Sequence, residues 1–185
     1  MAYIFDPSDL HRIAKQAIGL PHKEMVRLII DQLAKAYPEH IEQRENWILS
    51  LAGSAMGIMT ILHGSLSEYV IIFGTPIGTE GFSGRYWIEI YDFVLSGEMW
   101  TYSEDDFRER TVSRPGDMGY LRRSQAKGFR LSEGTWLLEY GRGAIPTALP
   151  FALSDAVVGL DLPTIAKTFR LYGRLVIKEL RQGKI

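Results

Sequence analysis

Hydrophobic residues recur at helical spacing near the amino terminus. The apolar positions that share one face are Leu10, Ile13, Ala14 and Ala17, and their separation of three or four residues is typical of an α-helix. Asp6 can cap this helix, Pro7 fits its first turn, and Gly19 stops the pattern. A second apolar stripe predicts another helix over residues 22–37, which Pro38 ends.

The pattern changes between Trp47 and about Glu139. The segments there are short, rich in β-branched and aromatic residues, and separated by glycines. Strands are predicted at residues 67–75, 84–97 and 134–141. Because several strands follow one another without a helix between each pair, the pattern favours an antiparallel sandwich or barrel.

Beyond residue 144 the pattern becomes helical again. Residues 146–160 are apolar on most sides, whereas residues 163–181 separate two kinds of side chain. One stripe holds Ile165, Phe169, Tyr172, Val176 and Leu180, and the opposite stripe holds Lys167, Arg170, Arg174, Lys178 and Arg181. Two interpretations of the basic stripe stay open: a solvated face over a core-packed helix, or a helix lying on an anionic membrane surface.

Composition narrows the function classes. The chain has 185 residues, a net charge of −1 and no cysteine, so neither a general attraction to nucleic acid nor thiol chemistry is expected. Its histidines, which are His11, His22, His40 and His63, lack the spacing of metal ligands, and no metal is expected. The basic stretch from residue 108 to 130 is interpreted as a solvated loop or hairpin, because no nucleic-acid-binding motif accompanies it.

The sequence shows no recognisable targeting signal. The amino terminus does not resemble a signal peptide, and no apolar run reaches the roughly 18 residues that span a bilayer. We therefore expect a protein on the cytoplasmic side that does not cross a membrane by itself.

Two carboxylates fall on apolar strand faces. Side chains alternate along a strand, so Asp92 lies on the more apolar face of its strand and Glu139 shares a face with Leu137. An unpaired charge in such surroundings is unfavourable, and each group must be paired, hydrogen-bonded or protonated. If the two lie close together they can share a proton, which suits proton exchange at carbon or the binding of a cation. Spacing alone does not show that they meet, and a structural ion pair of Glu139 with Arg85 or Arg142 stays open.

Three stretches resemble a known family. They are "ILHGSLSEYVIIFGT" (residues 61–75), "GFSGRYWIEIYDFVLSG" (81–97) and "WLLEYGRGAIPTALPFALSD" (136–155). They closely resemble the family that contains the sigma receptor and the fungal sterol isomerase, an enzyme that moves a ring double bond from the 8,9 to the 7,8 position. The segments "YIFDPSDL" (3–10) and "GTEGFSG" (78–84) are more similar to the isomerase branch.

The resemblance implies an α+β, mainly β fold in one domain, residues 1–185. A cupin-like β-barrel is expected at residues 46–143, after a helical N-terminal segment (1–45) and before two C-terminal helices (144–185) that cover the barrel and rest against a membrane. Relatives carry an amino-terminal anchor, and this chain begins just after the place where the anchor would end, so any membrane contact is expected to be peripheral. A trimer is implied through a Gly-x-x-x-Gly segment, which reads "GSAMG" here (53–57).

The resemblance also implies a buried, largely apolar ligand cavity. Glu139 matches the essential glutamate of the family, Asp92 matches its partner in the sigma receptor, and Tyr69 matches the tyrosine that hydrogen-bonds to the glutamate. The other implied ligand-binding residues are Glu68, Met59, Ile71, Phe73, Ile90, Leu149, Ala152 and Tyr172. No metal or organic cofactor is implied.

Three functions follow as hypotheses. In the first, Glu139 and Asp92 alternate as acid and base and move a sterol double bond through a carbocation. In the second, the same cavity binds a sterol or a hydrophobic amine without turnover, and Glu139 forms a salt bridge with the amine. In the third, the protein is a membrane-surface scaffold with an unused cavity.

Some positions depart from the isomerase branch. That branch places acidic residues at the positions of Glu89 and Ile90, whereas this chain has the sigma-like Asp92. Leu121 stands near the place of a histidine that relatives carry in the central loop. Both departures count against transferring isomerase activity to this chain by resemblance alone.

Overall fold

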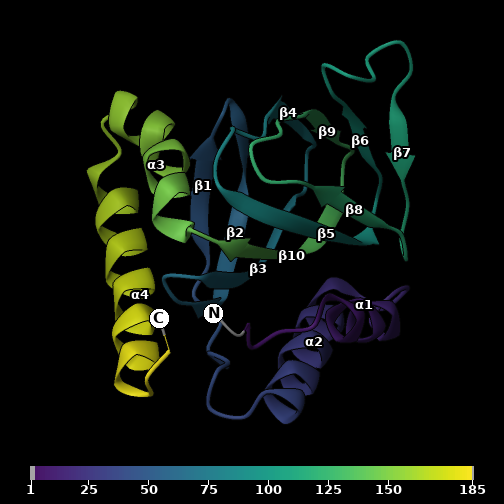
Figure 1. Cartoon of the computed structure of the whole chain (residues 1–185). Helices are drawn as coiled ribbons and strands as arrows, with labels where there is room; N and C mark the ends of the chain where they lie inside the picture. The colour runs from purple at the N-terminus through teal and green to yellow at the C-terminus, as the bar shows by residue number, and fades with distance from the viewer. Residues whose placement is uncertain (1–2, 185) are drawn as a thin grey trace.

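The computed structural model describes residues 3–184 of the chain. Two helices near the amino terminus lie beneath a strand-rich body, and two C-terminal helices lie along its side (Figure 1). The helices are α1 (Pro7–Gln16), α2 (His22–Ala36), α3 (Leu149–Val158) and α4 (Leu162–Arg181), and a short 3-10 helix, η1 (Ile145–Ala148), precedes α3.

The first two helices form where the hydrophobic pattern predicts them. The Asp6 side chain accepts a hydrogen bond from the backbone N–H of Ser8 at 2.7 Å, and Pro7 occupies the first helical position. Helix α2 ends at Ala36, just before the residue that precedes Pro38, because proline disfavours helical geometry in the residue before it.

The strands form two antiparallel sheets. The larger sheet has the order β1 (Ile48–Ala52), β2 (Ala55–Gly64), β3 (Glu68–Thr75), β10 (Thr135–Gly143), β5 (Ile88–Ser96) and β8 (Met118–Leu121), and the smaller has the order β4 (Thr79–Phe82), β9 (Gly128–Leu131), β6 (Met99–Tyr102) and β7 (Thr111–Ser113). The fold is thus α+β and mainly β, with N-terminal and C-terminal helices packed on the sheets, as expected.

Two segments differ from the sequence prediction. The strand expected from Gly84 begins only at Ile88, because Gly84 has a φ of +80° and the Tyr86 hydroxyl donates a hydrogen bond back to the Ser83 carbonyl, which closes a turn. The basic stretch at residues 108–130, expected as a solvated loop or hairpin, instead contributes β7 and the start of β9 to the smaller sheet and β8 to the larger sheet.

Both faces of the larger sheet are apolar. Its outer face packs against α1 and α2, and the fully buried residues of this core include Val70, Ile72, Phe93, Leu138, Tyr140, Leu10, Ile29 and Leu33. Its inner face, offset by one residue along each strand, borders the space between the two sheets. The core on the helical side therefore holds the sheet in place while its inner face remains available for a ligand.

The C-terminal helices pack on the open side of the larger sheet. Helix α3 contacts β1, and α4 contacts both β1 and β2 (Figure 1). The apolar stripe predicted for α4 is partly wrong, because Phe169 and Leu180 are 53% and 45% exposed. The buried side chains of α4 are Leu175 and Glu179, since the carboxylate of Glu179 turns inward to bind His40 at 2.8 Å.

No helix among the described residues is long and apolar enough to cross a bilayer. Each glycine of "GSAMG" is required by a contact within the chain. A Cβ atom at Gly53 would lie 2.3 Å from the Phe82 carbonyl oxygen, and one at Gly57 would lie 2.6 Å from the Gly74 carbonyl oxygen. These glycines therefore give no support for self-association, and the trimer stays a prediction.

Candidate functional site

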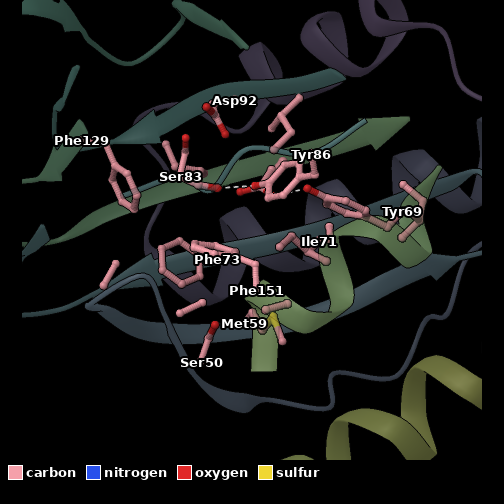
Figure 2. A pocket seen from close by; sticks show the side chains of 18 of the residues that line it. Ser50, Met59, Tyr69, Ile71, Phe73, Ser83, Tyr86, Asp92, Phe129 and Phe151 are labelled. Atoms are coloured by element: carbon pink, nitrogen blue, oxygen red, sulfur yellow. Dashed lines mark hydrogen bonds between the residues drawn. The ribbon is translucent and has the colours of Figure 1, made fainter. Parts of the chain in front are cut away.

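A cavity of about 230 Å³ lies between the two sheets and beneath α3. Figure 2 shows aromatic and aliphatic side chains around it, among them Phe73, Phe151 and Met59. All seven apolar or aromatic residues expected by position line it, namely Met59, Ile71, Phe73, Ile90, Leu149, Ala152 and Tyr172. This volume is slightly below the roughly 300–1,000 Å³ that ligand pockets commonly enclose.

The two inward carboxylates are direct neighbours across strands. The β5–β10 register pairs Asp92 with Glu139, and side chains opposed in this way lie within reach of each other. The Tyr69 hydroxyl donates a hydrogen bond to Glu139 Oε1 at 2.6 Å. Gly141, opposite Tyr69 on β10, leaves room for this ring, because a Cβ atom there would lie 2.2 Å from it.

Burial changes the acidity of Glu139. Loss of hydration in the cavity, together with the nearby charge of Asp92, raises the pKa of Glu139 to about 7, although the Tyr69 hydrogen bond and Lys127 act in the opposite direction. Burial also raises the pKa of Tyr69 well above its usual value, so its hydroxyl remains a donor. The cavity thus holds a carboxyl group that both gains and loses a proton near neutral pH.

A cation that the sequence interpretation missed also lines the cavity. The ammonium of Lys127 lies 2.5 Å from Asp92 Oδ2, and the two side chains are only 11% and 5% exposed. Lys127 belongs to the basic stretch for which the sequence predicts a solvated loop or hairpin. It lies two residues before Phe129, which also faces the cavity, so the alternation of side chains along β9 is the signal that would have identified it.

The alternative pairing of Glu139 with an arginine is absent from the described contacts. Arg142 instead binds Glu89, with Nε 2.7 Å from Oε2, and Arg85 binds Glu104 at the surface. Glu139 is therefore held by Tyr69, and Lys127 is the cation on the neighbouring Asp92.

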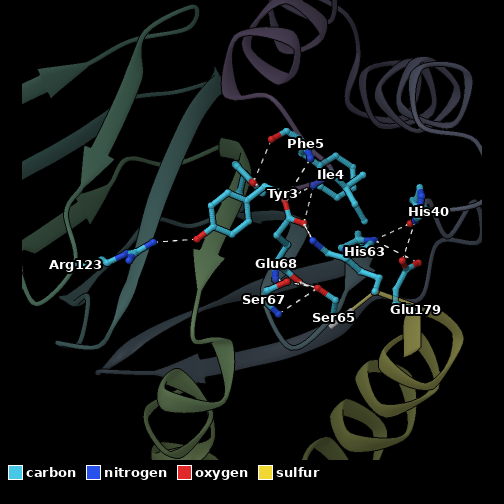
Figure 3. A network of polar contacts seen from close by, with 12 residues as sticks. Tyr3, Ile4, Phe5, His40, His63, Ser65, Ser67, Glu68, Arg123 and Glu179 are labelled. Carbon is cyan, nitrogen blue, oxygen red and sulfur yellow. Dashed lines mark hydrogen bonds and ion pairs between the residues drawn. The ribbon is translucent and has the colours of Figure 1, made fainter. Parts of the chain in front are cut away.

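Glu68 lies outside the cavity, contrary to its assignment as a ligand-binding residue. It is the residue next to Tyr69 in β3, and adjacent strand residues point to opposite faces. Its carboxylate accepts hydrogen bonds from the backbone of Ile4 and Phe5 (Figure 3) and from the Tyr140 hydroxyl at 2.6 Å.

Three potential metal ligands gather near Glu68. His40, His63 and Glu179 bring donor atoms within 4.8 Å of one another in the described part of the chain, a grouping that their spacing in the sequence did not reveal. However, His40 already binds Glu179 at 2.8 Å, and His63 Nδ1 donates to the His40 carbonyl at 2.9 Å (Figure 3). These contacts explain the cluster as a link between α4 and β2.

The sequence of this chain is similar to those of two kinds of known protein. The profile of the family described as "ERG2 and Sigma1 receptor like protein" matches residues 1–184. A C-8 sterol isomerase ERG2 of Gibberella zeae is 40% identical over 187 residues, covering 99% of this chain and 79% of that protein. A sigma non-opioid intracellular receptor 1 of Gallus gallus is 40% identical over 180 residues, covering 96% of this chain and 81% of the receptor. Equal identity to both does not separate the isomerase from the receptor.

Solved structures resemble part of the chain only distantly. An RmlC-like cupin from Shewanella frigidimarina has a TM-score of 0.43 at 16% identity and covers 57% of this chain and 86% of its own. KdgF from a Halomonas species has a TM-score of 0.43 at 11% identity and covers 56% of this chain and 90% of its own.

Proposed function

The chain belongs to the ERG2 and Sigma1 receptor like protein family, and on that premise we propose that its cavity binds a sterol and shifts a ring double bond from the 8,9 to the 7,8 position. The observation that carries the proposal is Glu139, a carboxyl group with a pKa of about 7 in an apolar cavity. Such a group is half protonated near neutral pH and can both give and receive a proton.

The proposed reaction needs only the side chains of this cavity. The protonated Glu139 donates its proton to one carbon of the ring alkene, and the neighbouring ring carbon becomes a carbocation. A carboxylate, either Glu139 itself or Asp92, then removes a proton from the carbon on the other side. The number of protons and electrons is unchanged, so the step is an isomerisation. Because the cavity excludes water, the carbocation is not attacked by water before it loses its proton.

Aromatic rings support the same proposal. Tyr69 and Phe73 line the cavity, and the face of an aromatic ring attracts positive charge by about 0.5–2 kcal/mol. Tyr69 additionally orients Glu139 through its 2.6 Å hydrogen bond.

A turnover experiment in deuterium oxide tests this function. The purified protein is incubated with an 8,9-unsaturated sterol, and the product is expected to be the 7,8 isomer carrying one solvent deuterium. Glu139→Gln is expected to abolish the product. Glu133→Gln, which alters an exposed carboxylate of the turn before β10, is expected to retain it. If the sterol binds and no isomer forms, the isomerase proposal is wrong.

A second candidate function, binding without turnover, is favoured by the ion pair of Lys127 and Asp92. Asp92 is engaged by an ammonium and is not a free base, and the same ammonium opposes a carbocation. In this case the cavity holds a sterol or another hydrophobic guest, with Glu139 and Tyr69 as its polar contact. Tight sterol binding together with the absence of any isomer would support it.

We also propose peripheral membrane contact through the C-terminal helices. Large apolar side chains are exposed around the turn between α3 and α4, including Val158 (84%), Leu160 (78%) and Leu162 (67%). Basic residues of α4 such as Arg170 and Arg174 are exposed as well. Apolar residues flanked by cations favour anionic lipid surfaces.

A further inference from the structure

Lys127 is built into the wall of the cavity. Its backbone N–H donates to Ser83 Oγ at 2.9 Å, and its carbonyl accepts from the Ser83 N–H at 3.0 Å. The next residue, Gly128, leaves no room for a side chain, because a Cβ atom there would lie 2.4 Å from the Tyr102 ring. The backbone of the lysine is therefore held in place, and its ammonium reaches Asp92 Oδ2 at 2.5 Å.

The two carboxyl groups of the cavity have different hydrogen-bond donors. Asp92 and Glu139 lie opposite each other in the β5–β10 register. The ammonium of Lys127 donates to Asp92, whereas the neutral hydroxyl of Tyr69 donates to Glu139 at 2.6 Å. A charged donor stabilises an ionised carboxylate more strongly than a neutral donor does. The proton that two neighbouring carboxyl groups would otherwise share is therefore expected on Glu139.

The other titratable groups around the cavity do not change this assignment. They are Tyr69, Tyr86 and Tyr172, and burial raises the pKa of each of these phenols, so they stay neutral at the pH where Glu139 titrates. Helix α3 contributes only apolar side chains to the lining. Among the described residues that line the cavity, Lys127 is the only cation.

We propose that Lys127 is a positioning residue that holds Asp92 as a carboxylate, so that Glu139 alone supplies and recovers the proton of the double-bond shift. Glu139 transfers its proton to one ring carbon, and a C–H bond forms there. The resulting carboxylate of Glu139 takes a proton from the carbon on the other side of the cation, where a C–H bond breaks. Asp92 and Lys127 neither gain nor lose a proton. These roles rest on the proposed function, but the group that holds the proton can be identified without a substrate.

Carbon-13 NMR of the ligand-free protein identifies that group. The side-chain carboxyl carbons of aspartate and of glutamate are labelled in separate samples, which are titrated across neutral pH. In wild-type protein the signal that Glu139→Gln removes is expected to titrate at about pH 7, and the Asp92 signal is expected to keep the shift of a carboxylate. In Lys127→Met the two carboxyl groups compete for one proton, so the Asp92 signal is expected to titrate as well.

The pH dependence of turnover is a second readout. Because the reaction needs protonated Glu139, wild-type turnover is expected to decline as pH rises through about 7. Lys127 lowers the pKa of Glu139, so Lys127→Met is expected to move this decline upward by about one pH unit or more. Lys127→Arg keeps the positive charge and is expected to restore the wild-type profile. Lys35→Met, which removes a charge from an exposed site on α2, is expected to leave the profile unchanged.

A double variant separates this mechanism from one in which Asp92 is the base. Asp92→Asn/Lys127→Met removes both members of the ion pair, so neither charge is left buried and unpaired if Lys127→Met folds poorly. Because Glu139 remains, turnover is expected to fall less than about tenfold, whereas loss of a catalytic base lowers a rate by about a hundredfold or more. A loss of that size in a folded double variant that binds sterol would overturn the proposal.

The two readouts distinguish failure of this role from failure of the proposed function. If the Asp92 signal titrates near neutral pH in wild-type protein, or if Lys127→Met changes neither the NMR titration nor the pH profile, the role of Lys127 is wrong and the isomerase proposal stands. If NMR places the proton on Glu139 but neither wild type nor any variant forms an isomer, the proposed function is wrong while the effect of Lys127 on Asp92 stands.

Discussion

At the scale of single residues, burial of Glu139 has a measurable effect on stability. Its pKa is raised to about 7 in the folded protein, against about 4.3 in an unfolded chain. Between these values the folded state binds more protons, so stability decreases as pH rises from about 4 to 7 and is constant above. Glu139→Gln removes this dependence. We therefore compare the unfolding free energy of Glu139→Gln with that of wild type at each pH. The difference, variant minus wild type, is expected to be about 1–3 kcal/mol larger at pH 8 than at pH 5.

Urea denaturation of both proteins at the two pH values measures this difference. Glu133→Gln is the matched control, because its carboxylate is exposed, and it is expected to follow the wild-type pH profile. A variant Glu139→Gln whose stability relative to wild type is equal at pH 5 and pH 8 would show that Glu139 titrates normally.

Strand parity predicted part of the site at this scale. It placed Asp92 and Glu139 on inward faces, and the register brings them opposite each other. The same parity places Glu68 on the face opposite Tyr69 and so opposes its assignment as a ligand-binding residue, because neighbouring residues of a strand face opposite sides. The position of Lys127 in the cavity was not predicted, because a run of charged residues is normally a solvated surface. The surrounding basic residues are indeed mostly exposed.

At the scale of elements, α3 forms part of the cover of the cavity. Leu149, Phe151 and Ala152 of this helix line the cavity. The helix has no side-chain cap at its start, and Asp155 ties it to the turn between β1 and β2 by accepting the Ser54 N–H at 2.7 Å. Asp155→Ala removes this tie. Because one hydrogen bond contributes about 1 kcal/mol, we expect sterol association and dissociation each to accelerate about fivefold.

Stopped-flow fluorescence with a fluorescent sterol measures both rates. The equilibrium affinity is expected to change little, since both rates rise together. Asp155→Asn retains an acceptor oxygen and should remain close to wild type. Unchanged rates in Asp155→Ala would mean that access does not depend on α3.

Most of the long elements were predicted from the hydrophobic pattern, except β2 with its ten residues, and the short strands were not. The strands β3, β5 and β10 have eight or nine residues, enough for alternation to be recognised. The strands β4, β6, β7, β8 and β9 have only three or four residues each, and the pairing across the sheet that defines them is not local. The inward turn of Glu179 on α4 was missed for a related reason, because its partner His40 is far away in sequence.

At the scale of the whole molecule, exposed apolar side chains gather around the turn between α3 and α4, where membrane contact is proposed. These residues lie where the two C-terminal helices join, and the helices pack against β1 and β2 (Figure 1). Val158→Ser/Leu162→Ser is expected to weaken partitioning onto anionic phospholipid vesicles about tenfold or more, because each apolar side chain buried in lipid contributes about 1.5–3 kcal/mol. Vesicle sedimentation measures the partitioning.

Phe107→Ser is the control for the loss of exposed apolar surface. Phe107 is 65% exposed in the loop between β6 and β7, and its loss is expected to leave partitioning unchanged. Equal partitioning of the double variant and wild type would mean that this side does not contact lipid.

Glu68 contacts residues near both ends of the described part of the chain. Its carboxylate accepts hydrogen bonds from the backbone N–H groups of Ile4 and Phe5 (Figure 3). It also accepts one from the Tyr140 hydroxyl of β10 and pairs with Lys184 beyond α4 at 2.8 Å. Removing one partner of a buried ion pair costs about 3–5 kcal/mol, so Glu68→Ala should lower the unfolding free energy by about that amount. Because Glu68 lies on the face away from the cavity, sterol affinity of the folded fraction should be preserved.

Comparing Glu68→Ala with Glu139→Gln tests whether the two faces of the larger sheet have separate roles. Both are buried or nearly buried glutamates on neighbouring strands, but one faces the cavity and the other faces the chain ends. Glu68→Ala should therefore change denaturation and not ligand titration, whereas Glu139→Gln should change ligand binding or turnover. Limited proteolysis should cleave Glu68→Ala near both ends first, since each end loses a contact. If Glu68→Ala instead keeps its stability and loses sterol affinity, the separation of the two faces of the sheet is wrong.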